Sequence, residues 1–146
     1  MCKVERVAAE IVRPLRHKVL RPNLPISSSV MPLDNHDASL HFCVKNGNRI
    51  LSVASFYKEP FDELSDKESY RLRGMATEPK EQGNGYGSQV LKAALIYLKQ
   101  KTNTEILWCN ARTTAFGFYE KMGLRIVGDE FDIPNIGPHK KGFIYL

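Results

Sequence analysis

The stretch YRLRGMATEPKEQGNGYG (residues 70–87) decides the fold of this chain. Its first eight residues alternate well enough to form a β-strand, and Pro79 ends that strand because proline lacks an amide donor. Beyond the glycines, apolar residues recur at helical spacing, at Val90, Leu91, Ala94, Leu95 and Leu98. The sequence therefore predicts a strand, a glycine loop and a helix in direct succession.

The glycine loop has a composition that suits an anion. Gly83, Gly85 and Gly87 lie at every second position, and glycine lets a ligand approach the backbone without a Cβ in the way. The amides at the start of a helix lack intrahelical acceptors, and the helix dipole adds partial positive charge there. A glycine-rich turn without a ligand is the plainer alternative, but the position between strand and helix favours a phosphate site.

The spacing of the glycines excludes two common phosphate loops. Counted from Gly83, both the Walker loop and the dinucleotide fingerprint require a glycine where this chain has Ser88. The motif that is present is Gln-x-x-Gly-x-Gly, at Gln82, Gly85 and Gly87. It resembles the acetyl-CoA motif of the GNAT family of N-acetyltransferases.

A second stretch carries the same resemblance. Residues 115–124 read Ala-Phe-Gly-Phe-Tyr-Glu-Lys-Met-Gly-Leu and are similar to the family pattern Ala-x-x-Phe-Tyr-x-Lys-x-Gly-Phe. Most members have an asparagine three residues before that alanine, where this chain has Arg112, and the nearest asparagine is Asn110. Either residue is therefore expected to contact the cofactor. Residues 129–139 resemble the ending of a bacterial ElaA-like subgroup.

The resemblance implies an α/β (α+β) fold and a single domain over residues 1–146. A central, twisted, mostly antiparallel mixed sheet of six to seven strands is expected, flanked by about four helices. Two central parallel strands are expected to splay into a V that receives the pantetheine arm. Besides Asn110 or Arg112, the expected acetyl-CoA contacts are Met75, Ala76, Thr77, Gln82, Gly83, Asn84, Gly85, Tyr86, Gly87 and Ser88.

The resemblance also implies acetyl transfer from acetyl-CoA to a primary amine, by direct attack through a tetrahedral intermediate. An amine with a pKa of about 10 must first lose a proton, and Glu130 and His139 are the candidate bases. Tyr119 is expected to protonate the departing thiolate. Packing on a helix stripe is the structural alternative for Tyr119, and a turn position is the alternative for His139. A catalytically silent CoA-binding module of the same fold is the alternative function.

The acceptor amine is not revealed by the motifs. Arg73 shares a strand face with Arg71 and is expected to point into the acceptor site. His17 lies in the first expected helix, which borders the acceptor cleft in the family, although an exposed helix position is the alternative. Residues 22–38 are rich in proline and serine and predict either a substrate lid or a disordered loop. The acidic residues of 57–68 predict a solvated loop or, alternatively, a surface that attracts a cationic amine.

Composition limits the remaining classes. The net charge is +5, but Lys and Arg are spread along the chain. The charge therefore fits a phosphorylated cofactor at least as well as a polynucleotide, with solubility alone as the plainer alternative, and no nucleic-acid partner is expected. No apolar run is long enough for a membrane span, and residues 1–6 lack the apolar core of a signal peptide, which predicts a cytoplasmic protein. The three cysteines lie far apart and predict reduced thiols and no metal site. A small-molecule or peptide amine is the expected partner, and the family's common homodimer is one expected state.

Overall fold

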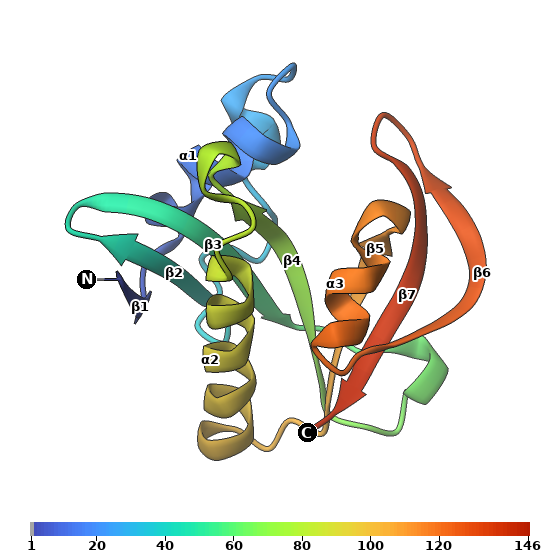
Figure 1. Cartoon of the computed structure of the whole chain (residues 1–146). Coiled ribbons are helices and arrows are strands. Elements are labelled where there is room, and N and C mark those ends of the chain that lie inside the picture. Colours follow the sequence, from blue (N-terminus) through green and yellow to red (C-terminus); the bar gives the residue numbers. More distant parts are fainter. Residues whose placement is uncertain (1) are drawn as a thin grey trace.

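A computed structural model describes residues 2–146. Seven strands form one mixed sheet in the order β1-β2-β3-β4-β5-β7-β6 (Figure 1). Within this described part, β4 and β5 pair parallel and every other neighbouring pair is antiparallel. The strands are β1 (Cys2–Arg6), β2 (Leu40–Asn46), β3 (Arg49–Lys58), β4 (Ser69–Thr77), β5 (Ile106–Arg112), β6 (Arg125–Ile133) and β7 (Gly137–Tyr145). The mixed, mostly antiparallel sheet expected from the sequence is confirmed.

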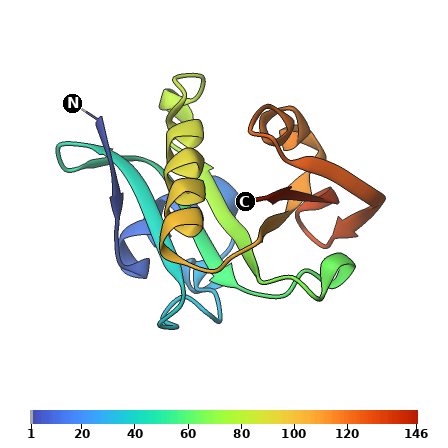
Figure 2. The same ribbon diagram turned by 90° about the horizontal axis from the view of Figure 1, so that it is seen from below.

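Within residues 2–146, three α-helices cover the sheet, against the about four expected: α1 (Ala9–Leu20), α2 (Tyr86–Lys101) and α3 (Phe116–Lys121). Helix α1 packs on one face, whereas α2 and α3 pack on the other (Figure 2). The remaining helical segments among the described residues are short 3₁₀ turns, at Ile26–Ser29, Asp62–Leu64, Pro79–Glu81 and Thr113–Ala115. Residues 110–112 are the end of β5 and lead directly into the 3₁₀ turn and α3.

Helix α1 runs without interruption through Pro14 as one element. Val12 and Leu15 on its inner face are buried against Val53 of β3 and Ala76 of β4. On the opposite face, the expected stripe of α2 is buried against β2 and β3. The two faces of the sheet are therefore filled by separate apolar clusters.

Strand β4 contains a bulge at Gly74, a glycine inside a strand whose sequence suggests either a bulge or a close backbone approach. Gly74 has a φ of +62°, which favours glycine, and the pairing with β3 shifts register between Val53 and Ser55. The bulge lies just beyond residues 69–72, where β4 pairs with β5.

Strands β4 and β5 separate after a short parallel contact. They pair only where residues 69–72 lie beside residues 106–109. Beyond that point β5 continues in pairing with β7, and β4 continues in pairing with β3. The expected V between the central parallel strands is confirmed, and it leaves residues 73–77 of β4 without a strand partner on the β5 side.

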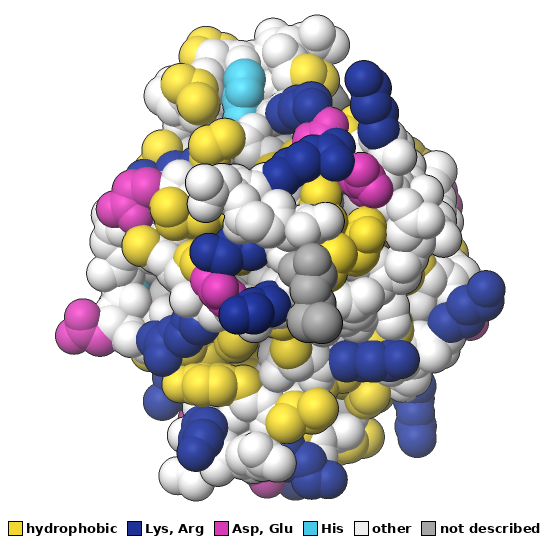
Figure 3. Space-filling view, turned by 60° about the vertical axis from the view of Figure 1, so that its left-hand side comes forward, with side chains coloured by type: hydrophobic (Ala, Val, Ile, Leu, Met, Phe, Trp, Pro, Cys, Tyr) yellow, Lys and Arg dark blue, Asp and Glu magenta, His cyan; other side chains and the backbone are white. Residues whose placement is uncertain are grey.

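Residues 22–38 are ordered, so the prediction that this loop is disordered is wrong. Ser29 and Asp34 are buried within it, and the carboxylate of Asp34 is held by side chains of α1 and β3. No helix among residues 2–146 is both long and apolar enough to cross a membrane. Figure 3 shows Lys and Arg side chains spread singly over one face of the molecule, between hydrophobic and acidic groups.

Candidate active site

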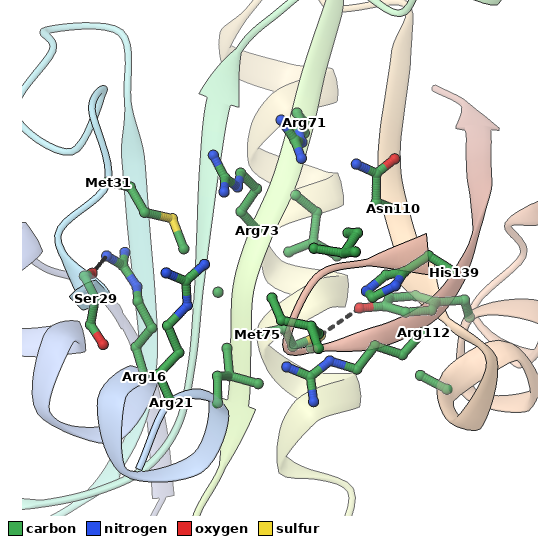
Figure 4. A pocket seen from close by; sticks show the side chains of 17 residues that line it. Arg16, Arg21, Ser29, Met31, Arg71, Arg73, Met75, Asn110, Arg112 and His139 are labelled. Carbon is green, nitrogen blue, oxygen red and sulfur yellow. Dashed lines mark hydrogen bonds between the residues drawn. The ribbon is translucent and has the colours of Figure 1, made fainter. Parts of the chain in front are cut away.

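A cavity of about 200 Å³ opens where β4 and β5 separate (Figure 4). Its walls come from α1, β4, β5, α3, β7 and the loops that follow α1 and β6. Six residues singled out in the sequence line it: Arg73, Met75, Asn110, Arg112, Tyr119 and His139. Four of these lie in strands that border the V, which explains why positions distant in sequence meet here.

Tyr119 approaches the cavity from α3. Its side chain is 9% exposed, and its hydroxyl donates to the Sδ of Met75 across 3.9 Å, the dashed line that reaches Met75 in Figure 4. Burial raises the pKa of Tyr119 far above that of a free phenol. The hydroxyl therefore stays protonated at neutral pH, and its weak sulfur acceptor leaves it able to donate to a ligand.

His139 enters the same cavity from β7. It is 3% exposed and stacks on Phe131, with the ring centroids 5.9 Å apart. Its Nδ1 lies 2.7 Å from the carbonyl oxygen of Gly137. A carbonyl can only accept, so Nδ1 carries the proton and Nε2 of the neutral ring carries the lone pair. That nitrogen is a base available to the cavity.

Two other expected residues lie outside the cavity. Glu130 is exposed on β6, next to the Phe131 ring that faces His139, and it does not line the cavity. His17 points its Nε2 at the carbonyl oxygen of Leu24, 2.7 Å away, and so fastens α1 to the following loop. The geometry supports neither a base role for Glu130 nor an acceptor contact by His17.

The glycine loop leads from β4 to α2 and leaves the first amides of the helix free. Gly83 and Gly85 have φ values of +88° and +82°, and Gly85 is the N-cap. No side chain caps the helix, and its first turn contains no acidic residue. Gln82 and Asn84 are exposed beside these glycines. The amides are therefore available to an anion.

The other loop-proximal residues expected to bind cofactor have structural contacts of their own. Ala76 is buried beneath α1, so only its backbone can face the V. The hydroxyl of Thr77 lies 2.9 Å from that of Ser52, and Ser88 donates to the Sδ of Met122. Tyr86 accepts from Cys2, and Gly87 lies over Met75 and Thr77.

A buried ion pair supports the acceptor side of the cavity, and the sequence did not predict it. Arg16 appeared to lie on the exposed side of α1, yet it is 1% exposed. Its two terminal nitrogens donate to the two carboxylate oxygens of Asp34, at 2.8 and 3.1 Å. Burial alone would raise the pKa of Asp34, but hydrogen bonds from Arg16 and Tyr57 outweigh burial and hold that pKa well below its usual range.

Other residues that line the cavity were missed or left without a role. Arg71 carried a signal, since it alternates with Arg73 on one face of β4. Arg21, directly after α1, and Ile133 and Ile136, near the turn between β6 and β7, carried none. They reach the cavity because α1 and the β6–β7 hairpin converge on the V from opposite sides (Figure 1).

Residues 10–124 match the model of the acetyltransferase (GNAT) family. The chain belongs to this family. Among curated proteins, the GNAT chain is 34% identical to the N-acetyltransferase YitI of Bacillus subtilis (strain 168) over 139 residues, which are 95% of this chain and 93% of YitI. It is an acyltransferase, as these relations show.

Solved structures share the fold. Escherichia coli ElaA superimposes with a TM-score of 0.77 at 16% identity, covering 98% of the GNAT chain and 99% of ElaA. The spermidine/spermine N-acetyltransferase SpeG of Vibrio cholerae superimposes with a TM-score of 0.70 at 15% identity, covering 99% of the chain and 92% of SpeG. At these identities the two structures bear on the fold alone.

Proposed function

We propose that this GNAT enzyme moves an acetyl group from acetyl-CoA to the nitrogen of a primary amine by direct attack. The observation that carries the proposal is the opening between β4 and β5, which leads into a cavity holding both Tyr119 and His139. One residue offers a proton and the other a lone pair, which are the two groups that the reaction requires.

The chain fits acetyl-CoA at two points. Residues 73–77 of β4 have no strand partner on the β5 side, so backbone donors and acceptors there are free for an amide-bearing arm. The uncapped start of α2 suits the pyrophosphate. Bound acetyl-CoA supplies an activated acetyl group as a thioester. Both Asn110 and Arg112 line the cavity, so either can contact the cofactor.

The proton balance assigns a role to each of the two residues. The incoming ammonium gives a proton to Nε2 of His139, which makes its nitrogen a nucleophile. The carbon–nitrogen bond forms, the carbon–sulfur bond breaks, and the hydroxyl of Tyr119 protonates the sulfur. The second proton that the nitrogen loses restores the Tyr119 hydroxyl, and His139 passes the first proton to solvent. The products are an N-acetyl amine, CoA as a thiol and one proton released to solvent. Glu130 has no part in this scheme because it lies outside the cavity.

Calorimetric titration of the purified chain with acetyl-CoA tests the first half of the proposal, with ATP and NAD as controls. Selective binding of acetyl-CoA is expected. The variant Gly87→Val should stay folded, because Gly87 lies outside the positive-φ region. It should bind acetyl-CoA at least about 10-fold more weakly, because its added methyls would meet Met75, Thr77 and Phe118 where the glycine loop borders β4 and α3. Equal affinity for ATP and acetyl-CoA contradicts the assignment.

Thiol release in the presence of amines tests the second half. His139→Gln should lower kcat by at least about 100-fold at neutral pH and leave acetyl-CoA affinity unchanged, because glutamine keeps a polar side chain but is not a base. Unchanged turnover would remove His139 from the base role. Binding of acetyl-CoA without transfer to any amine would leave a CoA-binding module as the function.

A further inference from the structure

The cavity is lined by arginine and not by acidic residues. Among the described residues that line it, none is Asp or Glu, and five are arginines: Arg16, Arg21, Arg71, Arg73 and Arg112. Such a wall repels a cation and attracts an anion. This holds for the acceptor as well as for the cofactor, because the arginines come from both sides of the V.

Two of the five charges are balanced by carboxylates behind the cavity wall. Arg16 pairs with Asp34 through two hydrogen bonds. Arg71 lies 3.3 Å from a carboxylate oxygen of Glu59, and its guanidinium stacks over the ring of Trp108 at 4.9 Å from the ring centroid. These contacts fix the position of Arg71 and leave the other N–H groups of its guanidinium free to donate to a ligand.

The other three charges have no acidic partner within residues 2–146. Arg21 donates to the carbonyl oxygen of Ser28, 2.8 Å away, which does not neutralise it. Arg73 and Arg112 make neither a side-chain hydrogen bond nor an ion pair in this part of the chain. Arg112 lies at the Tyr119 end of the cavity, so Arg73 and Arg21 remain for the acceptor end.

Arg73 has the most constrained position of these. Its guanidinium lies between those of Arg71 and Arg21 (Figure 4). Burial lowers the pKa of Arg73 and the charge of Arg71 lowers it further, while the carboxylate of Glu59 opposes the shift; a guanidinium nevertheless remains protonated in proteins. Arg73 is thus held half-buried beside Arg71 and Arg21, and Glu59 offsets only part of the cost of that repulsion. A bound anion would remove that cost through charge-assisted hydrogen bonds.

Four buried polar atoms of residues that line the cavity lack a partner among the described residues. They are Nε of Arg16, Oγ of Ser29, Nε of Arg71, which is a donor, and Oδ1 of Asn110, which is an acceptor. Buried polar atoms without partners are rare in folded proteins and call for a partner such as a ligand or a bound water. A molecule with an anionic group and an N–H group satisfies the atoms of Arg71 and Asn110.

We propose that the acceptor is a small primary amine that carries an anionic group, a carboxylate or a phosphate, bound by Arg73 and Arg71. Oδ1 of Asn110 accepts a hydrogen bond from the amine. The inference rests on the proposed function and specifies its substrate class. The cavity of about 200 Å³ suits a molecule of amino-acid size. A polyamine is disfavoured because it has no group to pair with Arg73.

The arginines also act on the attacking nitrogen. Nearby positive charges disfavour an ammonium, so the pKa of a bound amine falls below its value in water. The proton then passes to Nε2 of His139 at a lower cost. The anionic group keeps the substrate bound against this repulsion. The same arginines therefore serve both to bind the substrate and to ease the transfer of its proton to His139.

The test measures kcat/KM by thiol release from acetyl-CoA with amines that differ in charge. The panel contains the common L-amino acids, their carboxamides, O-phosphoethanolamine and spermidine. At least one carboxylate or phosphate amine should turn over, about 10-fold or more above its uncharged counterpart, and spermidine should not. The amino acids and O-phosphoethanolamine separate a carboxylate from a phosphate.

Arg73→Gln should reduce kcat/KM for the preferred anionic amine by about 10- to 100-fold, the usual worth of hydrogen bonds to a charged group. Its affinity for acetyl-CoA should not change, and its activity with the carboxamide, which lacks the anionic group, should fall much less. Arg125→Gln removes the same charge from an exposed position of β6 and should leave the preference intact. A larger loss of kcat/KM for the anionic amine than for its carboxamide distinguishes anion binding by Arg73 from a structural role.

The outcomes separate this inference from the function on which it rests. If acetyl-CoA does not bind, the proposed function fails and the inference fails with it. If acetyl-CoA binds but spermidine or a carboxamide is the better acceptor, or no anionic amine turns over, only the inference is overturned. Equal loss of both activities in Arg73→Gln also overturns it.

Discussion

At the scale of residues, the arginines that line the cavity differ in whether a carboxylate already neutralises their charge. Arg16 is bound on both terminal nitrogens by Asp34, and it also donates to Ser55 and Tyr57. Arg73 has no such partner among the described residues. Arg16 and Asp34 form a buried ion pair that positions the cavity wall, which we call the frame, whereas Arg73 is free to bind a ligand. Removing each should therefore have a different effect.

Tyr119→Phe tests the proton donor. The substitution removes one hydroxyl whose contact within the described chain is the Sδ of Met75, so the fold and the affinity for acetyl-CoA should be unchanged. Turnover should fall by about 100-fold, as expected for loss of a positioned acid. Thiol release and calorimetry measure the two quantities. Tyr145→Phe, at an exposed tyrosine, is the control, and an equal fall in both variants would contradict the assignment.

Arg16→Met tests the frame, the buried ion pair between Arg16 and Asp34. Removing Arg16 leaves the buried Asp34 carboxylate with Arg13, 3.3 Å away, as its remaining charged partner, which should cost up to about 3–5 kcal/mol in the free energy of unfolding. Urea denaturation measures it. Arg13→Gln removes the more exposed partner of the same carboxylate and should cost less than about 1 kcal/mol. A similar cost for both variants would show that Arg16 is not the principal partner of Asp34.

At the scale of elements, the bulge in β4 connects the frame to the V. Gly74 brings the strand so close to α1 that an added Cβ would lie 2.8 Å from Nε of Arg16. That nitrogen belongs to a side chain held at its far end by Asp34, so it cannot move aside cheaply. The bulge, the ion pair and the opening between β4 and β5 therefore depend on one another.

Gly74→Ala measures this dependence against Gly47→Ala. Both glycines have a φ near +60°, so alanine costs about 1–2 kcal/mol at either position from the backbone alone. At Gly47 nothing lies within 4 Å of the added Cβ, whereas at Gly74 the clash with Arg16 adds to the cost. Gly74→Ala should therefore have the lower urea midpoint and also reduced turnover. Equal midpoints would mean that α1 adjusts freely.

The sequence predicted the elements well where a local pattern determines them. Strand, glycine loop and helix over residues 70–101 follow from alternation, proline and helical spacing, and the V follows from the family resemblance. The burial of Arg16 was not predictable, because its partner Asp34 lies in an irregular loop that only tertiary contacts order. Glu130 and His17 failed to reach the cavity for a related reason. Which side of an edge strand or helix faces a site depends on packing that local spacing does not contain.

At the scale of the whole molecule, the polar network beneath the cavity joins α1, β2, β3 and the 22–38 loop. Arg16 donates to the hydroxyl oxygen of Ser55, and His41 places Nδ1 2.7 Å from that oxygen. Nε2 of His41 lies 2.9 Å from the carbonyl oxygen of Asp34, so Nε2 carries the proton and Nδ1 accepts from Ser55. A second proton on the ring would leave Ser55 facing two donors. The network therefore fixes a neutral His41 beside an ionised Asp34.

This arrangement predicts how stability depends on pH. Burial lowers the pKa of His41 from 6.5, and the hydrogen bonds of Asp34 hold its pKa well below 3.8. In both cases the unfolded chain binds a proton at a higher pH than the folded chain does. The free energy of unfolding should therefore fall as the pH drops below about 6.5, through His41, and fall again below about 3.8, through Asp34.

Urea denaturation of the wild type, His41→Gln and Asp34→Asn across pH 7.5 to 3 checks both steps. His41→Gln should flatten the curve between pH 7 and 5, because the residue that the unfolded chain protonates is gone. Asp34→Asn should be less stable than the wild type at pH 7, since Arg16 loses its charge partner, yet change less below pH 4. Curves that run parallel to the wild type would locate the pH dependence elsewhere.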